Sequence, residues 1–403
     1  MNIGILLREL DVSGGTQRQA ICLARELQNL GDEVSVFAQQ VDAGRCFPDL
    51  LRGLTVVPLS GHASGRDKAP WLLRTFRRFS GDSPAFRAAR RIAAELPGDL
   101  DVLNVHEYDA YLAAIYWKRI TGKPIVWMMN DFPQELCLQW NPRRPWRRIE
   151  RLLDGKAWET RRRRAMVREF DKVLALSDME GAKFTREIGI AAETVVSGLD
   201  VDAFDFKPRT APHAGPLRLF SNAMLYPHRR MEDIIDAVVI LLGRGIDLSW
   251  VHAGDLSRAP SYAASVRRRI ADAGLGERVR LLGSVSDARL VREFQAADIF
   301  LFPNTPQSWG LAVFQAMACG TPVIVSRGAG ASEVLTHGKN ALLVNPFSPL
   351  QIADAVEELR MNRALWQNLH GEGRRFVVEN IRWDLYAGRM RVIFARVAFR
   401  DVP

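Results

Sequence analysis

Short apolar runs rich in β-branched residues alternate with longer segments of helical periodicity along most of the chain. Residues 16–30 have the helical pattern, which ends at Gly31 between two apolar runs of strand length. Such alternation is typical of βαβ units, which form a parallel sheet covered by helices on both faces. In the first half of the chain we expect strands at residues 2–6, 33–37, 55–57, 102–105, 124–129 and 173–176.

The alternation is interrupted at residues 198–216, where Pro208, Pro212 and Pro216 indicate a linker. It resumes with expected strands at residues 217–220, 248–252, 279–282, 299–302, 322–325 and 341–344, and a helix at 383–397 follows. A length of 403 residues also suits two or three domains. The pattern therefore predicts an α/β protein with two doubly wound parallel-sheet domains that face each other across a cleft.

The chain carries 55 lysines and arginines against 46 acidic residues, a net charge of +9 that suits an anionic partner. Its four cysteines form no CxxC pair, so we expect neither a disulfide scaffold nor a cysteine zinc site. The apolar run at the N-terminus is too short for a signal peptide, and no window approaches the ~20 apolar residues of a membrane span. We expect a reduced, cytoplasmic protein, soluble or peripheral on the inner face of the membrane.

Two segments combine positive charge with aromatic residues. Residues 66–91 contain eight basic and two acidic residues, and residues 143–172 contain twelve basic and five acidic ones. Trp71, Trp146 and Trp158 lie among them. Such mixtures favour contact with an anionic membrane surface, although solvated helices with a buried apolar side have the same composition. No segment has the pattern of a nucleic-acid-binding module, so we expect no nucleic acid partner.

A glycine loop follows the first expected strand. Gly14 and Gly15, in the sequence VSGGT, precede a helix, so their backbone amides can approach an anion at its N-terminus. A plain turn capped by Thr16 would explain the same residues. The loop lacks the GxGxxG spacing and the following acidic residue of a dinucleotide site.

The segment PNTPQSWGLAVFQAMACG, at residues 303–320, is the second candidate anion site. We expect Ser308, Trp309 and Gly310 to begin a helix after the strand at 299–302, with the amides of Gly310 and Leu311 directed at a phosphate. Gln307 precedes this helix and Gln315 lies within it. An ordinary strand-to-helix connection with two surface glutamines is the alternative.

A pair of arginines follows the first strand of the second domain. Arg229 and Arg230, in the sequence AMLYPHRRMED, can reach the carboxyl edge of that strand, where a diphosphate would bind. A solvated helix start is the commoner explanation of such a pair.

With these segments identified, the chain resembles glycosyltransferase family 4, the retaining nucleotide-sugar enzymes of the GT-B fold. The resemblance rests on the first strand with its glycine loop, on VSGLDVDAF, and on QSWGLAVFQAMACGTPVIVS followed by SEVLTHGKNALLVNP. It implies two Rossmann-like domains. Residues 1–205 would bind the acceptor and face the membrane, residues 206–380 would bind the nucleotide-sugar donor, and residues 381–403 would form a helix that crosses back to the first domain.

The resemblance also implies roles at the donor site. Gln307 and Gln315 occupy the positions of two family glutamates that hold the transferred sugar and the nucleotide ribose. Met224 and Arg229 occupy those of a family arginine and lysine that bind the diphosphate. A glutamine keeps a carbonyl acceptor but loses the charge, at a cost of ~1–2 kcal/mol for each site.

Three more residues are expected near the reacting centre, with Gln307. Asn130, followed by Asp131, stands about where the family often has a histidine after the fifth strand. His106, in NVHEY at the end of the fourth expected strand, is a further candidate, or a hydrogen-bonded strand-end histidine. No His, Asp and Glu cluster has metal-ligand spacing, so we expect no metal, and no cofactor beyond the substrate itself.

The implied activity is retaining transfer of a hexose, mannose or similar, from a GDP- or UDP-linked donor. The acceptor would be a saccharide or a lipid-linked molecule in cell-surface glycan synthesis. Two interpretations of the glutamines remain, an active transferase with a weakened donor site and a catalytically weak homologue that acts as a partner subunit. An epimerase or phosphorylase of similar architecture is less well supported, because no acid/base pair or cofactor lysine is evident.

Overall fold

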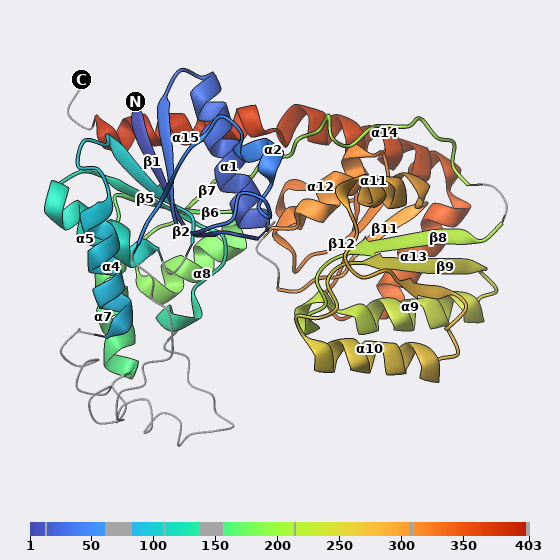
Figure 1. The fold of residues 1–403 in the computed structure, drawn as a ribbon. Helices are drawn as coiled ribbons and strands as arrows, with labels where there is room; N and C mark the ends of the chain where they lie inside the picture. The colour runs from blue at the N-terminus through green and yellow to red at the C-terminus, as the bar shows by residue number, and fades with distance from the viewer. Residues whose placement is uncertain are drawn as a thin grey trace. The chain divides into compact units, whose positions relative to one another are not determined.

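The structure is a computed structural model that describes residues 1–12, 14–60, 83–107, 110–137, 156–212, 215–306 and 309–399. The chain divides into two compact units, one formed by Met1–Ser197 with Trp383–Pro403 and the other by Gly198–Arg382 (Figure 1). Each unit contains one sheet of parallel strands joined through helices, which confirms the predicted α/β class.

The N-terminal unit is built on a seven-stranded sheet in the order β3-β2-β1-β4-β5-β6-β7. All of its described strand pairs are parallel. The strands are β1 (Asn2–Leu10), β2 (Glu33–Val41), β3 (Thr55–Pro58), β4 (Val102–Val105), β5 (Ile125–Met129), β6 (Lys172–Ala175) and β7 (Glu193–Thr194). The helices are α1 (Gly15–Asn29), α2 (Pro48–Leu51), α4 (Pro84–Glu95), α5 (Tyr111–Thr121), η1 (Gln134–Leu136), α7 (Lys156–Val167), α8 (Asp178–Ile188) and α15 (Trp383–Ala398).

Helices cover this sheet because its strands are apolar on both sides. The core that β4 and β5 share with α4, α5, α7 and α8 contains the fully buried side chains of Trp117, Trp127 and Phe184. Helix α15 packs against α1 (Figure 1). Asp32, at the start of β2, fixes this contact, since its buried carboxylate accepts hydrogen bonds from the N-terminal ammonium at 2.8 Å and from Arg391 Nε at 2.7 Å.

The C-terminal unit is built on a six-stranded parallel sheet in the order β10-β9-β8-β11-β12-β13. The strands are β8 (Leu217–Asn222), β9 (Leu248–Ala253), β10 (Val279–Leu281), β11 (Ile299–Phe302), β12 (Val323–Ser326) and β13 (Leu342–Val344). The helices are η2 (Pro227–Arg229), α9 (Met231–Gly243), α10 (Pro260–Asp272), α11 (Asp287–Ala296), α12 (Leu311–Ala318), η3 (Gly330–Val334), α13 (Pro349–Met361) and α14 (Arg363–Asn380).

Both sheets have the same strand order, in which the chain starts at a central strand, moves to one edge and then returns to fill the other. The direction therefore reverses between β1 and β4 in the first sheet and between β8 and β11 in the second. Ligands of doubly wound sheets bind at this switch point, outside the carboxyl ends of the strands. The topology thus singles out one candidate location in each unit.

The expected strands are all present, with small differences at their ends. Strand β1 continues to Leu10 instead of residue 6, because Leu7 and Leu10 are buried and β1 still pairs with β2 at Leu10 and Val41. The short strand β7 was not expected. Among the described residues, no helix combines the length and the apolar character that crossing a membrane requires.

Candidate active site

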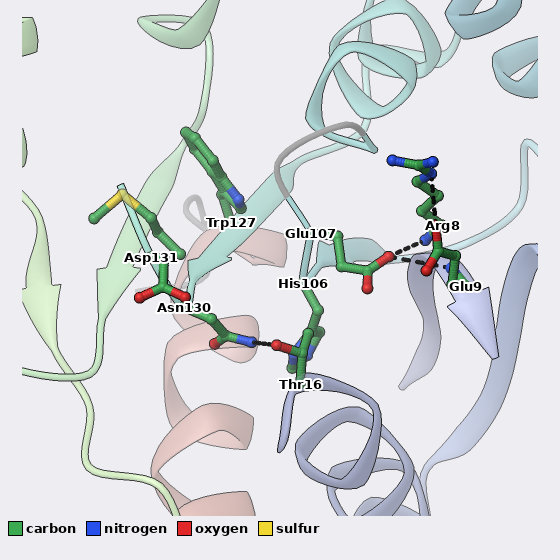
Figure 2. A pocket seen from close by; sticks show the side chains of 9 residues that line it. Arg8, Glu9, Thr16, His106, Glu107, Trp127, Asn130 and Asp131 are labelled. Carbon is green, nitrogen blue, oxygen red and sulfur yellow. Dashed lines mark hydrogen bonds and ion pairs between the residues drawn. The ribbon is translucent and has the colours of Figure 1, made fainter. Parts of the chain in front are cut away.

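A pocket of about 120 Å³ lies at the switch point of the N-terminal sheet. The carboxyl ends of β1, β4 and β5 and the first turn of α1 form its wall (Figure 2). We call it the switch-point pocket, and its lining residues are Arg8, Glu9, Thr16, His106, Glu107, Trp127, Met129, Asn130 and Asp131. It therefore brings together three of the residues expected from the sequence, His106, Asn130 and Asp131.

Glu107 connects β4 to the end of β1 and to α1. Its Oε2 atom accepts hydrogen bonds from the backbone amides of Arg8 and Glu9, at 2.5 and 3.2 Å (Figure 2). Its Oε1 atom accepts one from Gln17 Nε2 at 2.8 Å. Burial nevertheless raises the pKa of Glu107 from its ordinary 4.5 to about 7. Sequence reasoning missed this residue, although it follows His106 directly in the quoted segment NVHEY.

His106 is a fully buried wall residue of the pocket. Its Nε2 atom lies 2.7 Å from Oδ1 of Asn104, two residues earlier on β4. Burial lowers the pKa of His106 to about 3, so the ring is neutral at physiological pH. Its Nδ1 atom is also buried and has no hydrogen-bond partner in the structure as described. The residue can act as a neutral hydrogen-bonding group but is a poor proton acceptor.

Asn130 joins the end of β5 to the glycine loop. Its Nδ2 atom donates to Thr16 Oγ1 at 2.8 Å, and its Oδ1 atom is buried without a partner among the described residues (Figure 2). Gly14 caps α1 with no side-chain hydrogen bond, and a Cβ on Gly15 would meet no atom within 4 Å. Open space beside Gly15 leaves its backbone accessible, as the anion-site interpretation of this loop requires. Asp131 lines the pocket from an exposed position.

In the C-terminal unit, the segments after β8 and β11 meet at the second switch point. The backbone amide of Thr305 donates to the carbonyl of His228 at 2.8 Å, which holds η2 beside the chain that follows β11. Two buried donors lie in that chain, Asn304 Nδ2 and Trp309 Nε1, and neither has a partner in the described structure. Groups of this kind need an acceptor such as a phosphate or sugar oxygen.

Helix α12 begins at Leu311, later than the expected start at Ser308. Gly310 is its N-cap, with φ of +133°, a conformation that side chains other than glycine rarely adopt, and a Cβ there would lie 2.9 Å from Phe302. Gln315 is therefore only one turn into the helix, and it is 9% exposed. Gln307 and Ser308 lie outside the described residues.

The two expected arginines differ in their surroundings. The guanidinium of Arg230 forms ion pairs with Asp233 at 2.7 Å and Glu232 at 2.6 Å, and it covers the ring of Phe347. These two carboxylates therefore neutralise most of the charge of Arg230. Arg229 is the last residue of η2, which the Thr305 hydrogen bond holds beside β11. Met224 is 45% exposed.

The expected site residues thus fall into two groups, one in each unit. Sequence reasoning missed Glu107, Trp127 and Asn304, whose roles depend on burial and on strand order instead of on local motifs. Within the described residues, no group of three or more His, Cys, Asp or Glu side chains could hold a metal ion.

Two family models match the chain, one in each half. One, described as "Glycosyltransferase Family 4", matches residues 13–202, and another, described as "Glycosyl transferases group 1", matches residues 215–362. The chain belongs to glycosyltransferase family 4. This transferase is 26% identical over 417 residues to a phosphatidyl-myo-inositol mannosyltransferase of Mycobacterium leprae, covering 99% of this chain and 97% of the relative. It is 27% identical to a D-inositol 3-phosphate glycosyltransferase of Pseudarthrobacter chlorophenolicus, covering 84% and 80%.

Solved structures support the GT-B fold of the transferase. HepE of Anabaena, solved in complex with UDP and glucose, matches with a TM-score of 0.73 and 17% identity over 98% of this chain and 99% of its own. Sucrose-phosphate synthase of Thermosynechococcus elongatus matches with a TM-score of 0.72 and 18% identity over 98% of both chains. The family and the fold together make this chain a hexosyltransferase that uses a nucleotide sugar, and they do not favour the alternative of a non-catalytic partner subunit.

Proposed function

We propose that this transferase moves a hexose, mannose or similar, from a GDP- or UDP-linked donor to a polyol acceptor, with retention of configuration. The acceptor is a saccharide or lipid-linked molecule in cell-surface glycan synthesis. The observation that carries the proposal is the pair of buried donors, Asn304 Nδ2 and Trp309 Nε1, in the segment that joins β11 to α12. They supply hydrogen bonds where a doubly wound sheet binds its ligand.

The donor site stabilises negative charge without requiring a metal. The first amides of an α-helix have no partners within the helix, and they carry its positive end, so the start of α12 at Gly310 and Leu311 suits a diphosphate. Arg229 adds a cation from the neighbouring η2. As the nucleoside diphosphate leaves the anomeric carbon, these groups stabilise the growing charge. The acceptor hydroxyl attacks from the same face and passes its proton to the leaving phosphate.

The glutamines weaken this site but are compatible with turnover. Gln315 places a neutral amide one turn behind the phosphate-binding amides, where it can accept one ribose hydroxyl and donate to another. The family resemblance assigns Gln307 to the transferred sugar and Ser308 to the diphosphate. Neither role needs a proton transfer, so the lost charges lower the affinity for the donor more than the rate of the chemical step.

The acceptor binds in the N-terminal unit, and the size and polarity of the switch-point pocket support this assignment. A volume of about 120 Å³ is of the order of one six-membered ring, since a cavity of ~150 Å³ accommodates benzene. Both named relatives act on inositol compounds, a class of cyclic polyol. HepE binds UDP and glucose, which supports uracil as a candidate base of the donor.

A further proposed partner is an anionic membrane surface. We place the protein in the cytoplasm, peripheral on the inner face of the membrane. The first basic segment and the first half of the second lie largely outside the described residues. In the described part, α7 carries an aromatic side chain that could contact a membrane and a basic one that could not. Trp158 is 37% exposed, whereas Arg163 is buried and pairs with Glu159. Flotation with anionic and neutral vesicles tests this proposal. We expect binding to anionic vesicles that weakens with added salt, and equal binding to both would contradict it.

A donor screen tests the proposed function. The purified protein is titrated calorimetrically with UDP, GDP and their glucose and mannose conjugates, and release of nucleoside diphosphate is then measured with cyclic polyol acceptors. We expect one base to bind and acceptor-dependent release from one of its sugar conjugates. If no nucleotide binds at millimolar concentration and none is released, the assignment of the donor site is wrong.

A further inference from the structure

His106 and Asn104 form a hydrogen-bonded pair whose direction the structure determines. The Nδ2 atom of Asn104 donates to the backbone carbonyl of Val126 on the neighbouring strand β5, at 3.1 Å. If the Asn104 amide were turned the other way, its Oδ1 atom would face the carbonyl oxygen of Val126, and both atoms are acceptors. Oδ1 of Asn104 must therefore face His106. Because a carbonyl oxygen only accepts, the Nε2 atom of His106, 2.7 Å away, must carry the ring proton.

The other ring nitrogen of His106 is therefore an acceptor. A neutral imidazole carries one proton, so protonation at Nε2 leaves only a lone pair on Nδ1. This atom is buried and has no partner among the described residues. Burial also lowers the pKa of His106 to about 3, which keeps the ring neutral. The pocket wall thus presents a lone pair that no group of the described chain satisfies.

Asn130 presents a second acceptor in the same pocket by the same logic. Its Nδ2 atom is used by Thr16 Oγ1, so its Oδ1 atom is left as a buried acceptor without a described partner. Trp127 Nε1, from β5, is a buried donor that also has no hydrogen-bond partner among the described residues. All three residues line the switch-point pocket (Figure 2). A ligand that satisfies them must supply two hydrogens and accept one.

We infer that His106 and Asn130 bind two hydroxyl groups of the acceptor polyol, and that Asn104 is a positioning residue that holds His106 in the required tautomer. Hydroxyl groups both donate and accept, so neighbouring hydroxyls on one ring can satisfy both lone pairs and Trp127 Nε1. A carboxylate or a fully ionised phosphate has no hydrogen to give to these lone pairs, and the charge of Arg8 on the pocket wall is already paired with Glu9 at 3.1 Å. This inference rests on the proposed function, because it specifies how the acceptor is held.

Nuclear magnetic resonance of ¹⁵N-histidine-labelled wild-type protein tests the tautomer directly. The His106 signals are assigned by their loss in His106→Asn. We expect a ring protonated at Nε2, with Nδ1 unprotonated, and a shift of the Nδ1 resonance when a cyclic polyol is added. The probes are myo-inositol, methyl α-mannoside and methyl α-glucoside. A ring protonated at Nδ1, or an Nδ1 signal that none of the three probes moves at saturating concentration, would overturn the inference.

Matched variants separate hydrogen bonding from structural support. His106→Leu removes the acceptor, whereas His106→Asn keeps a polar atom close to the position of Nδ1. We expect His106→Leu to weaken polyol binding roughly tenfold with nucleotide binding unchanged, and His106→Asn to recover most of the loss. Equal losses in both variants, or a parallel loss of nucleotide binding, would contradict the assigned contact.

Asn104→Leu examines the positioning role. It should let the proton move to Nδ1 in part of the population, visible in the same spectra, with weaker polyol binding. An unchanged tautomer in a folded Asn104→Leu protein would show that Asn104 has no such role.

Polyol binding with the expected tautomer but no sugar transfer would overturn the proposed function alone. Sugar transfer by a protein with the opposite tautomer would overturn this inference alone.

Discussion

Replacing Glu107 with glutamine should remove a pH dependence from the stability of the N-terminal unit. The carboxyl group is buried where it ties β1 to α1, and its pKa is raised from 4.5 to about 7, chiefly by burial. Between pH 4.5 and about pH 7 the folded protein keeps the proton on Glu107, whereas the unfolded chain releases it. Its contribution to stability is therefore full below about pH 4.5 and is lost as the pH rises through about 7. The shift corresponds to about 3 kcal/mol over this window.

The substitution Glu107→Gln replaces the carboxyl group with a neutral amide of nearly the same shape, which cannot lose a proton. Its amide oxygen can still accept from the amides of Arg8 and Glu9. The bond from Gln17 is lost at every pH, because Gln17 Nε2 also donates to the carbonyl of Glu9 at 3.2 Å and cannot turn away from it. Wild type should therefore become less stable relative to the variant as the pH rises, by about 3 kcal/mol in total, most of it between about pH 5 and about pH 7.

Urea unfolding of both proteins at several pH values measures this difference. Glu9→Gln, a change of the same kind on the same pocket wall, is the comparison variant and should keep the pH dependence in a slightly weaker form, because the charge of Glu9 adds to the rise in the pKa of Glu107. A constant difference between wild type and Glu107→Gln across the pH range would refute the reasoning, since it would mean that Glu107 has the same protonation behaviour in the folded and unfolded chain.

Three further variants address other contacts. Arg229→Ala should weaken nucleoside diphosphate binding by about 2 kcal/mol, measured by calorimetry, because Met224 supplies no second cation; wild-type affinity would show that the diphosphate binds elsewhere. Gln315→Glu should tighten nucleotide binding about tenfold through a charge-assisted bond to the ribose, and a loss of affinity would argue against that position. Asp32→Asn should lower the free energy of unfolding by about 1–3 kcal/mol at neutral pH, because it loses charged partners in Arg391 and the N-terminus. Burial opposes the charge on Asp32, but these partners outweigh it and lower its pKa, so the effect should fade as the pH drops below about 4.

The fold was predictable from the sequence because a parallel sheet covered on both faces requires continuous apolar strands. The runs that became β4 and β11 illustrate this, since the expected and observed bounds coincide at Val102–Val105 and Ile299–Phe302. The end of β1 was less predictable. Arg8 and Glu9 interrupt the apolar run, but their backbone amides donate to Glu107, which follows β4 about 100 residues later in the chain.

The candidate site was predictable only where a local motif marks it. The glycine loop and the start of α12 are such motifs, although α12 begins at Leu311 because Gly310, which precedes it, has a positive φ outside the helical range. Asn104 and Trp127 could not be found in this way. Their importance depends on the hydrogen bonds that neighbouring strands leave unmade, and strand order determines those neighbours.

The central claim is that this chain transfers a hexose from a nucleotide sugar with retention of configuration. The most direct test is ¹H NMR of the anomeric proton of the product as it first forms, from the donor that the screen identifies. The account predicts a product with the anomeric configuration of the donor, formed in step with release of the nucleoside diphosphate. A product with inverted configuration, or diphosphate release without any glycosylated product, would contradict it.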